Sequence, residues 1–308
     1  MAGPLANRHS EPAPRCDAQA TLYNGAMPSR SPITLVSLAL AGFAANSLLC
    51  RVALRPPASI DPFTFTTIRL ASGAVVLLAI AATKRGTGAS RGNWPSSIAL
   101  FLYAIAFSVA YVRMTAGIGA LILFTAVQLT MIGGGIRSGE RLTPLQWLGL
   151  VLALAGLVVL TSRGVTAPDP LSAVLMSVAG VSWGVYSLRG RRSSQPLGDT
   201  AGNFARASPF AIGATLVALP GLHASPSGTL FAAASGALAS GLGYSIWYAA
   251  LPRLTATRAS IVQLAVPVAA AAGGIAFLGE HATMRLVVAT VVILSGISLA
   301  MLTRRRRS

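Results

Sequence analysis

Hydrophobic runs of helical length, separated by short stretches rich in Gly, Pro and Arg, recur along the chain from Ile33 to Leu302. A bilayer core about 30 Å thick requires roughly 20 helical residues, and most of the runs approach that length. Backbone polar groups in lipid must be hydrogen-bonded within the chain, so the runs are predicted to be helices. The expected spans are 33–53, 63–82, 96–113, 117–137, 144–162, 170–188, 204–221, 229–250, 256–278 and 283–302. This pattern predicts an all-α integral membrane protein with about ten transmembrane helices.

The second half of the chain repeats the first, largely at an offset of 140 residues. Residues 113–116 (RMTA) correspond to residues 253–256 (RLTA), and the Gly-Glu step at Glu140 corresponds to the one at Glu280. We assign residues 31–163 to a first repeat and residues 164–303 to a second. Each repeat holds five predicted helices, an odd number, so the two are expected to be inverted relative to each other. Two inverted five-helix repeats are a common plan among secondary transporters, with the binding site near the membrane midplane.

The charged residues predict the orientation. Residues 1–30 are polar and rich in Pro, which indicates a disordered cytoplasmic tail, and residues 304–308 form a basic cytoplasmic tail. Met1 and Met27 both remain open as the start of translation. Most arginines between the predicted helices fall on the side of the two tails, so both termini are expected in the cytoplasm. The chain is therefore predicted to be a multi-pass protein of the inner (cell) membrane.

The net charge of +17 does not indicate nucleic-acid binding. Only 10% of the residues are charged, against 54% hydrophobic, and the arginines lie beside apolar segments rather than on a basic face with interleaved aromatics. Basic residues next to membrane spans interact with lipid headgroups. The lipid bilayer and a small-molecule substrate are the expected partners, with no nucleic acid, and a second copy of the chain is a candidate for a homodimer.

Several motifs resemble the drug/metabolite transporter superfamily, specifically its EamA-like family. They are the two Gly-Glu steps at Glu140 and Glu280, the central glycines Gly156 and Gly296 of the last helix in each repeat, and residues 263–267 (QLAVP) in the ninth span. The resemblance covers residues 33 to 303 and implies ten helices and transport of a metabolite. It implies no particular substrate, because the family handles amino acids, nucleosides, sugars, polyamines and drugs.

Two arginines within the predicted spans are candidates for function, because a charge in the bilayer costs at least a few kcal/mol. Arg69 lies inside the second span, and Arg206 lies near the start of the seventh. They either contact substrate or serve assembly by reaching the interface or neighbouring carbonyl groups. Their matching positions in the two repeats favour the structural role.

Polar and aromatic residues near the middle of the spans are the candidate lining of a substrate pocket. An amide facing lipid would leave its donors and acceptors unpaired, so the amides should face the interior, where they bind substrate or join helices. The candidates are Asn46, Gln128, Trp183, Tyr186, Tyr244 and Gln263. Trp247 is a further aromatic that could instead belong to an interfacial belt.

Two further elements of the repeats carry expectations of their own. Pro267 in the ninth span is a candidate hinge, whereas the matching position in the fourth span is Val127, which predicts a straighter helix there. Glu140 and Glu280 lie at helix ends, and each is expected to be solvated and to cap the helix that follows it.

The preferred function is a secondary transporter that moves small metabolites, amino-acid-like or drug-like solutes, across the inner membrane by alternating access, with efflux as the favoured direction. The alternatives are a polytopic membrane enzyme and a membrane scaffold without transport activity. Catalysis requires a cluster of reactive groups, but the three histidines His9, His223 and His281 are scattered. We therefore expect no catalytic residues, no metal and no cofactor. The substrate, the coupling ion and the oligomeric state are left open.

Overall fold

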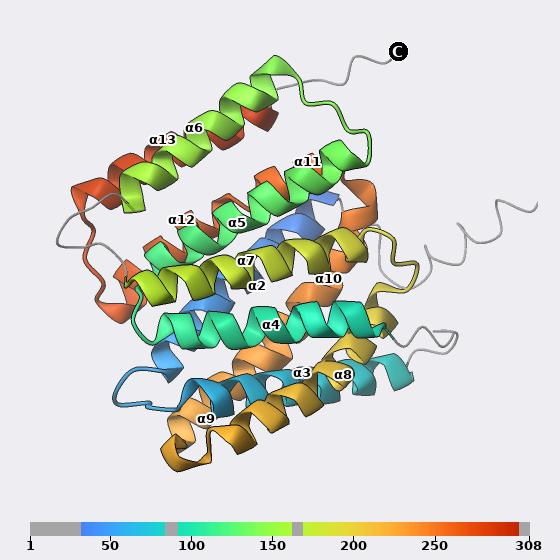
Figure 1. Ribbon diagram of the computed structural model, residues 1–308, viewed down its shortest axis with the longest axis vertical. Helices are drawn as coiled ribbons and strands as arrows, with labels where there is room; N and C mark the ends of the chain where they lie inside the picture. The colour runs from blue at the N-terminus through green and yellow to red at the C-terminus, as the bar shows by residue number, and fades with distance from the viewer. Residues whose placement is uncertain (1–31, 84–91, 162–168, 302–308) are drawn as a thin grey trace, which may run out of the picture.

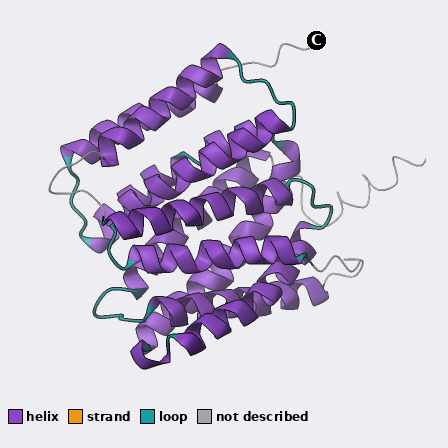
Figure 2. Ribbon diagram, viewed as in Figure 1, coloured by secondary structure: helices purple, strands orange, loops and turns teal. Residues whose placement is uncertain are grey.

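The computed structural model describes residues 32–83, 92–161 and 169–301, and these residues form helices joined by short loops (Figures 1 and 2). The predicted tails, 1–30 and 304–308, lie outside the described residues. The helices of the first half are α2 (Pro32–Ala53), α3 (Pro62–Thr83), α4 (Trp94–Tyr111), α5 (Ala116–Arg137) and α6 (Pro144–Thr161). Those of the second half are α7 (Pro170–Gly190), α8 (Pro196–Val217), α9 (Pro226–Ala234), η2 (Ser235–Leu242), α10 (Gly243–Ala250), α11 (Ala256–Val262), α12 (Ala265–Leu278) and α13 (Met284–Met301), with the short turns η1 (Leu219–Gly221) and η3 (Leu251–Arg253).

Within the described residues, seven helical segments are long and apolar enough to cross a membrane. They are α2, α3, α4, α5, α7, the run from α9 to η3, and the run from α11 to α12. The chain is therefore an all-α, multi-pass membrane protein.

The seventh predicted span differs from the observed helix. α8 begins at Pro196 and ends at Val217, whereas the pattern predicted residues 204–221. Proline is favourable in the first turn of a helix, where its missing N–H is not needed, and Asp199 in that turn interacts well with the helix dipole. The hydrophobic pattern could not detect this polar first turn. As a result, Arg206 lies in the middle of α8 and not near its start.

The eighth and ninth spans are irregular in ways that the pattern did not predict. The eighth changes from α-helix to π-helix over Ser235–Leu242 and then returns to α-helix. The ninth is interrupted at Gln263 and Leu264, between α11 and α12. Pro267 has no N–H to donate to the carbonyl group of Gln263, and that carbonyl instead accepts from Val266 at 3.0 Å. The matching helix α5, which has Val127 at this position, is continuous.

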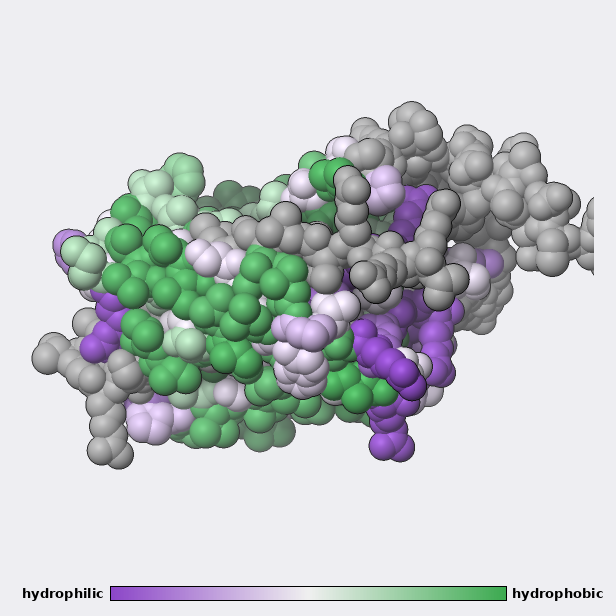
Figure 3. Space-filling model, turned by 90° about the horizontal axis from the view of Figure 1, so that it is seen from above, coloured by the Kyte–Doolittle hydropathy of each residue, from purple (hydrophilic) through white to green (hydrophobic). Residues whose placement is uncertain are grey.

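The helices pack into one large core and one small one. Figure 1 shows α6 and α13 together at one edge of the bundle and α3, α8 and α9 at the opposite edge. Gly156 and Gly296 allow α6 and α13 to approach closely, since a Cβ atom on Gly296 would press against the carbonyl oxygen of Gly149. On the face that carries this pair, hydrophobic residues cover the middle and hydrophilic ones gather toward the ends (Figure 3). That distribution suits a helix bundle surrounded by lipid.

Close packing of small residues makes a direct prediction. A Cβ atom on Gly180 of α7 would collide with the backbone carbonyl oxygen of Leu123 in α5, whereas one on Gly133 of α5 would meet open space. Gly180→Ala should lower the free energy of unfolding by about 1–3 kcal/mol, the usual cost of overpacking. Gly133→Ala, the matched control, should leave it unchanged or raise it by up to about 1 kcal/mol through helix propensity. Thermal unfolding of the purified variants measures both, and equal effects of the two would contradict the packing.

Candidate functional site

Arg69 of α3 lies in the centre of the large core and is 1% exposed. Its Nε donates to the hydroxyl oxygen of Ser240 at 2.9 Å. Its Nη2 donates to the hydroxyl oxygens of Tyr103, at 3.0 Å, and Tyr244, at 2.6 Å. The guanidinium carbon also lies 5.1 Å from the ring centroids of both Tyr103 and Phe107. Helices α3, α4, η2 and α10 therefore meet at a single positive charge.

No carboxylate balances this charge within the described part of the chain. Three ion pairs occur among the described residues, and Arg69 takes part in none of them. Its Nη1 is buried and has no hydrogen-bond partner among those residues. A buried charge without a counterion is costly, and hydroxyl groups and aromatic faces compensate only part of that cost. Arg69 is therefore the least compensated charge that the described structure buries.

The π-helix shapes the surroundings of Arg69. Residues five apart lie on one face of a π-helix, and this brings Ser235 and Ser240 to the same side of η2. Both hydroxyl groups donate to the amide oxygen of Asn46 on α2, at 2.7 and 3.2 Å. The amide nitrogen of Asn46 donates in turn to the hydroxyl oxygen of Tyr103 at 3.2 Å. Asn46, which is 1% exposed, thus links α2 to the groups that hold Arg69.

Aromatic rings cover this polar group. The ring centroid of Trp183 lies 4.5 Å from that of Tyr244 and 5.5 Å from that of Tyr186. Phe43 of α2 packs edge-on against Trp183 at 5.2 Å and against Trp247 at 5.6 Å. Trp247 is 0% exposed, so its alternative placement in an interfacial belt is wrong. The centre of the protein is a charged and hydroxyl-lined group enclosed by an aromatic shell.

The two glutamines lie beside this shell and join helices. Gln128 of α5 donates through Nε2 to the carbonyl oxygen of Ser260 at 2.9 Å. Gln263 accepts from the indole nitrogen of Trp183 at 2.8 Å, and its own Nε2 donates to the carbonyl oxygen of Ala259 at 3.0 Å. Both amides are buried as the sequence indicated. A direct role of these residues in binding remains a prediction.

Arg206 does not reach the central group. It is half-buried on α8, where its Nη1 donates to the carbonyl oxygen of Gly202 at 3.4 Å. Its guanidinium carbon lies 5.7 Å from the ring centroid of Trp94. Arg69 and Arg206 occupy related positions in the sequence but have different surroundings, since only Arg69 is enclosed.

Three residues of the central group were not among the predicted candidates. Tyr103 is a hydroxyl-bearing residue in the middle of an apolar span, the same signal that identified Tyr244. Ser235 and Ser240 looked like part of a smooth, close-packed helix face. Their shared orientation depends on the π-helix, which the sequence pattern does not reveal.

A second arrangement joins the two halves of the chain at Glu140. Its carboxylate accepts from the backbone N–H groups of Ala256, at 2.8 Å, and Thr257, at 3.1 Å, which are the first residues of α11. The hydroxyl of Thr257 adds a bond of 2.8 Å, and Arg191 pairs with the carboxylate at 3.3 Å. Burial by itself would raise the pKa of Glu140, but these hydrogen bonds and the charge of Arg191 lower the pKa below its ordinary value of 4.5.

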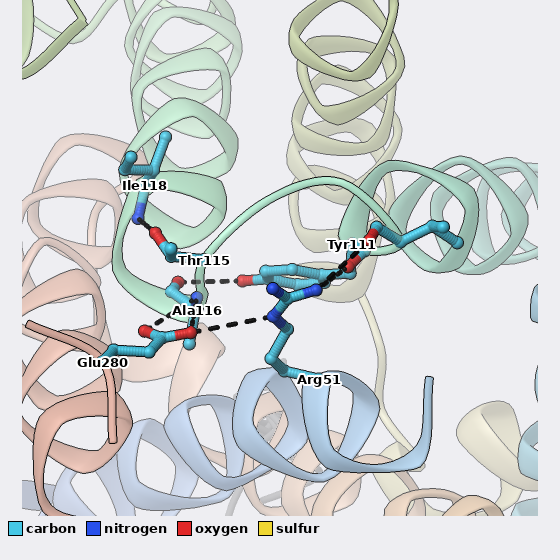
Figure 4. Close-up of polar contacts among 7 residues, drawn as sticks. Arg51, Tyr111, Thr115, Ala116, Ile118 and Glu280 are labelled. Carbon is cyan, nitrogen blue, oxygen red and sulfur yellow. Dashed lines mark hydrogen bonds and ion pairs between the residues drawn. The ribbon is translucent and has the colours of Figure 1, made fainter. Parts of the chain in front are cut away.

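Glu280 makes the corresponding contact with α5 (Figure 4). Its two oxygens accept from the backbone N–H of Ala116 at 3.1 and 3.2 Å. Arg51 of α2 lies 3.7 Å from the carboxylate and also donates to the carbonyl oxygen of Tyr111 at 2.9 Å. Each Glu therefore caps a helix of the other half, not the helix that follows it, and the expected capping role was wrong in its target. We call these contacts the Glu140 cap and the Glu280 cap.

The two caps lie at opposite ends of α5. Glu280 binds at its first residue, Ala116, and Glu140 follows just beyond its last residue, Arg137. A helix of 22 residues is about 33 Å long at 1.5 Å per residue. In Figure 1 the connection from α5 to α6 and the connection from α12 to α13 likewise lie at opposite ends of the bundle. At each end of the bundle, one carboxylate therefore links the two halves.

A basic cavity opens at the end that carries the Glu140 cap. Its volume is about 1010 Å³, and it lies between α4, α5, α7 and the start of α8. Among its lining residues are Asn93, Arg137, Arg189, Arg191, Arg192 and Asp199. We call this cavity the vestibule. It is lined by four arginines and one aspartate, and even with Arg191 paired to Glu140 the arginines outnumber the carboxylates, which favours the approach of anions.

Comparison with known proteins shows which family both halves of the chain match. The sequence model of the EamA-like transporter family matches residues 30–162 and again residues 170–302. An uncharacterized protein of Pseudomonas aeruginosa, PA1977, is 47% identical over 283 residues, which cover 92% of this chain and 98% of that protein. A crystal structure of a protein with 22% sequence identity matches with a TM-score of 0.71 over 90% of this chain and 100% of the other, which supports the fold alone.

Two more distant relatives have informative names. The aromatic amino acid exporter YddG of Ancylobacter novellus is 29% identical over 193 residues, 58% of this chain and 65% of that protein. The uncharacterized inner membrane transporter YedA of Escherichia coli is 30% identical over 90 residues, 29% of each chain.

The lowered pKa of Glu140 predicts how stability depends on pH. A carboxylate whose pKa is lower in the folded state stabilises that state above its unfolded pKa, here 4.5, and the contribution is lost as the pH falls through the folded value. Glu140→Gln should therefore be less stable than the wild type at pH 7, by about 0.5–2 kcal/mol for a lost cap. The difference should shrink as the pH falls below 4.5.

Thermal unfolding of purified wild type and variant between pH 7 and pH 3.5 measures this difference. Arg141→Gln, a change of charge at the exposed neighbouring residue, is the control and should follow the wild-type pH profile. A Glu140→Gln difference that stays constant across the range would show that the carboxylate does not carry the cap.

Proposed function

Since this chain belongs to the EamA-like transporter family, whose model matches both of its halves, we propose that it is a secondary transporter that moves small metabolites across the inner membrane by alternating access. The observation that carries the proposal is the pair of Glu caps. Each cap joins a loop of one half to a helix start of the other, and the two lie at opposite ends of α5. Rocking of one half against the other would open one end while the opposite end stays closed.

The proposed architecture is ten spans in two inverted repeats with both termini in the cytoplasm. The reciprocal caps support inversion, because equivalent residues of the two halves act at opposite ends of the bundle. The positive-inside tendency supports the orientation, since Arg137, Arg189, Arg191 and Arg192 line the cavity at the Glu140 end. In this orientation the vestibule faces the cytoplasm and the Glu280 cap closes the outer side.

The proposed substrates are amino-acid-like or drug-like solutes, with efflux as the direction. The relation to an aromatic amino acid exporter favours this choice over sugars and nucleosides. The enclosed aromatic shell around Trp183 and Tyr244 suits a solute with an apolar body. A vestibule on the cytoplasmic side suits loading from that side.

Counterflow in proteoliposomes tests the transport function. The full-length protein is reconstituted, preloaded with an unlabelled solute and supplied with the labelled form, using amino acids, organic acids, nucleosides, sugars and amines as the panel. Saturable accumulation above that of protein-free liposomes is expected for at least one class. Accumulation no greater than in protein-free liposomes across the whole panel would overturn the proposal.

Cross-linking the caps tests alternating access. In a background with Cys16→Ser and Cys50→Ala, one variant carries Glu140→Cys with Thr257→Cys, and a second carries Glu280→Cys with Ala116→Cys. If each end must open once per cycle, oxidation to the disulfide should abolish counterflow in both variants, and reduction should restore it. The matched controls are the four single-cysteine variants under the same oxidant. Full cross-linking at either end with transport unchanged would contradict alternating access through these caps.

A further inference from the structure

Arg69 lacks the carboxylate partner that three less buried arginines have in the described structure. Arg51, Arg113 and Arg191 lie toward the ends of the bundle, and each lies within 4.0 Å of a carboxylate. Arg69 is the most deeply buried of the four, and in the described structure its side-chain hydrogen bonds go to hydroxyl groups alone. If Arg69 served only to join helices, a neutral side chain of similar shape would do so without the cost of burying an uncompensated charge.

We propose that the transported solute carries a single carboxylate and that this carboxylate pairs with Arg69. The inference rests on the proposed transport function and names the chemistry of its substrate. Nη1 of Arg69 is enclosed and has no partner in the described chain, so it can donate to an acceptor without breaking an existing bond. Nη2 and the hydroxyl groups of Tyr103 and Tyr244 lie beside it and can serve a second carboxylate oxygen.

The surroundings favour one negative charge over two. The described interior supplies a single cation within an aromatic shell, so a monoanion would be neutralised and a phosphate dianion would keep one uncompensated charge. A cationic solute would meet Arg69 as a like charge. The rings of Phe43, Trp183 and Tyr244 offer contact to the apolar part of an organic acid.

The basic vestibule supplies a route for such a solute. Arg189 lines the cavity, and Trp183 lies six residues earlier on α7, which is about 9 Å deeper along the helix. The ring of Trp183 packs on Tyr244, whose hydroxyl group touches Arg69. In the described conformation Arg69, Trp183 and Tyr244 are all buried, so the solute would reach Arg69 only when the halves move. The vestibule would gather anions, and Arg69 would select among them.

Matched pairs of acids and amides test the inference. Phenylacetate, octanoate and N-acetylphenylalanine are compared with their neutral amides, and phenyl phosphate and phenethylamine serve as the dianion and the cation. Each is titrated against the purified full-length protein in nanodiscs at pH 7 and fixed ionic strength, and the shift in unfolding temperature gives an apparent Kd. At least one acid should bind about tenfold more tightly than its amide, the effect of one charge-assisted hydrogen bond or more.

Two variants assign the preference to Arg69. Arg69→Gln should lose the preference for the acid over the amide, whereas Arg206→Gln, which removes the intramembrane arginine outside the central group, should keep it. Size-exclusion chromatography checks that both variants are folded, and the wild-type comparison of acid with amide stands even if Arg69→Gln does not fold. Equal affinities for every acid and its amide, tighter binding of phenethylamine or phenyl phosphate, or a preference that survives in Arg69→Gln would overturn the inference.

The same compounds separate this inference from the transport function. Counterflow of amides as fast as that of acids would support the transport function and overturn the carboxylate site. Binding of acids through Arg69, together with no counterflow of any solute, would support the site and overturn transport.

Discussion

The backbone N–H groups at the starts of α5 and α11 are the groups on which the arrangement of the two halves depends. The first turn of a helix has donors without partners inside the helix, and burying them unsatisfied would cost several kcal/mol. Each start has its own threonine cap, Thr115 or Thr255, whose side chain accepts from one N–H group of the first turn. A carboxylate from the other half accepts from further donors, Glu280 from one at the start of α5 and Glu140 from two at the start of α11, and its charge also suits the helix dipole. The need to pair these donors thus ties the halves together at both ends.

Much of the fold could be predicted because lipid imposes a simple pattern. Apolar runs located most helices, and the constant offset between residues 113–116 and residues 253–256 located the two matched segments. The departures are local and have polar causes. α8 starts at Pro196, within a turn too polar for a hydropathy pattern, and the break before Pro267 follows from one missing N–H. Both signals were present in the sequence, but a pattern based on hydrophobicity weighs them too little.

The site was less predictable because it depends on which side chains meet across helices. Burial of Asn46, Gln128 and Gln263 followed from the cost of an unpaired amide, and the structure places all three inside. The contacts of the two arginines could not be predicted in the same way, since the repeat suggested equal roles for Arg69 and Arg206. Only Arg69 is enclosed, because η2 packs directly on α3 there, where a Cβ atom on Gly236 would collide with the backbone of residue 69. The sequence repeat therefore predicted the arrangement of helices, whereas the central group depends on packing that differs between the two halves.

The Glu caps at the ends of the bundle and the contacts around Arg69 at its centre differ in how fully they compensate charge. The ends are held by charged carboxylates on backbone N–H groups, and hydrogen bonds to charged groups contribute about 1.5–3 kcal/mol each. The hydroxyl groups around Arg69 also bond to a charge, but they leave that charge without a counterion and Nη1 without a partner. A carboxylate at the centre would supply both the missing counterion and a hydrogen-bond acceptor for Nη1. In the proposed carrier, this gain would offset part of the cost of parting one Glu cap from its helix, which would couple binding at the centre to opening at one end.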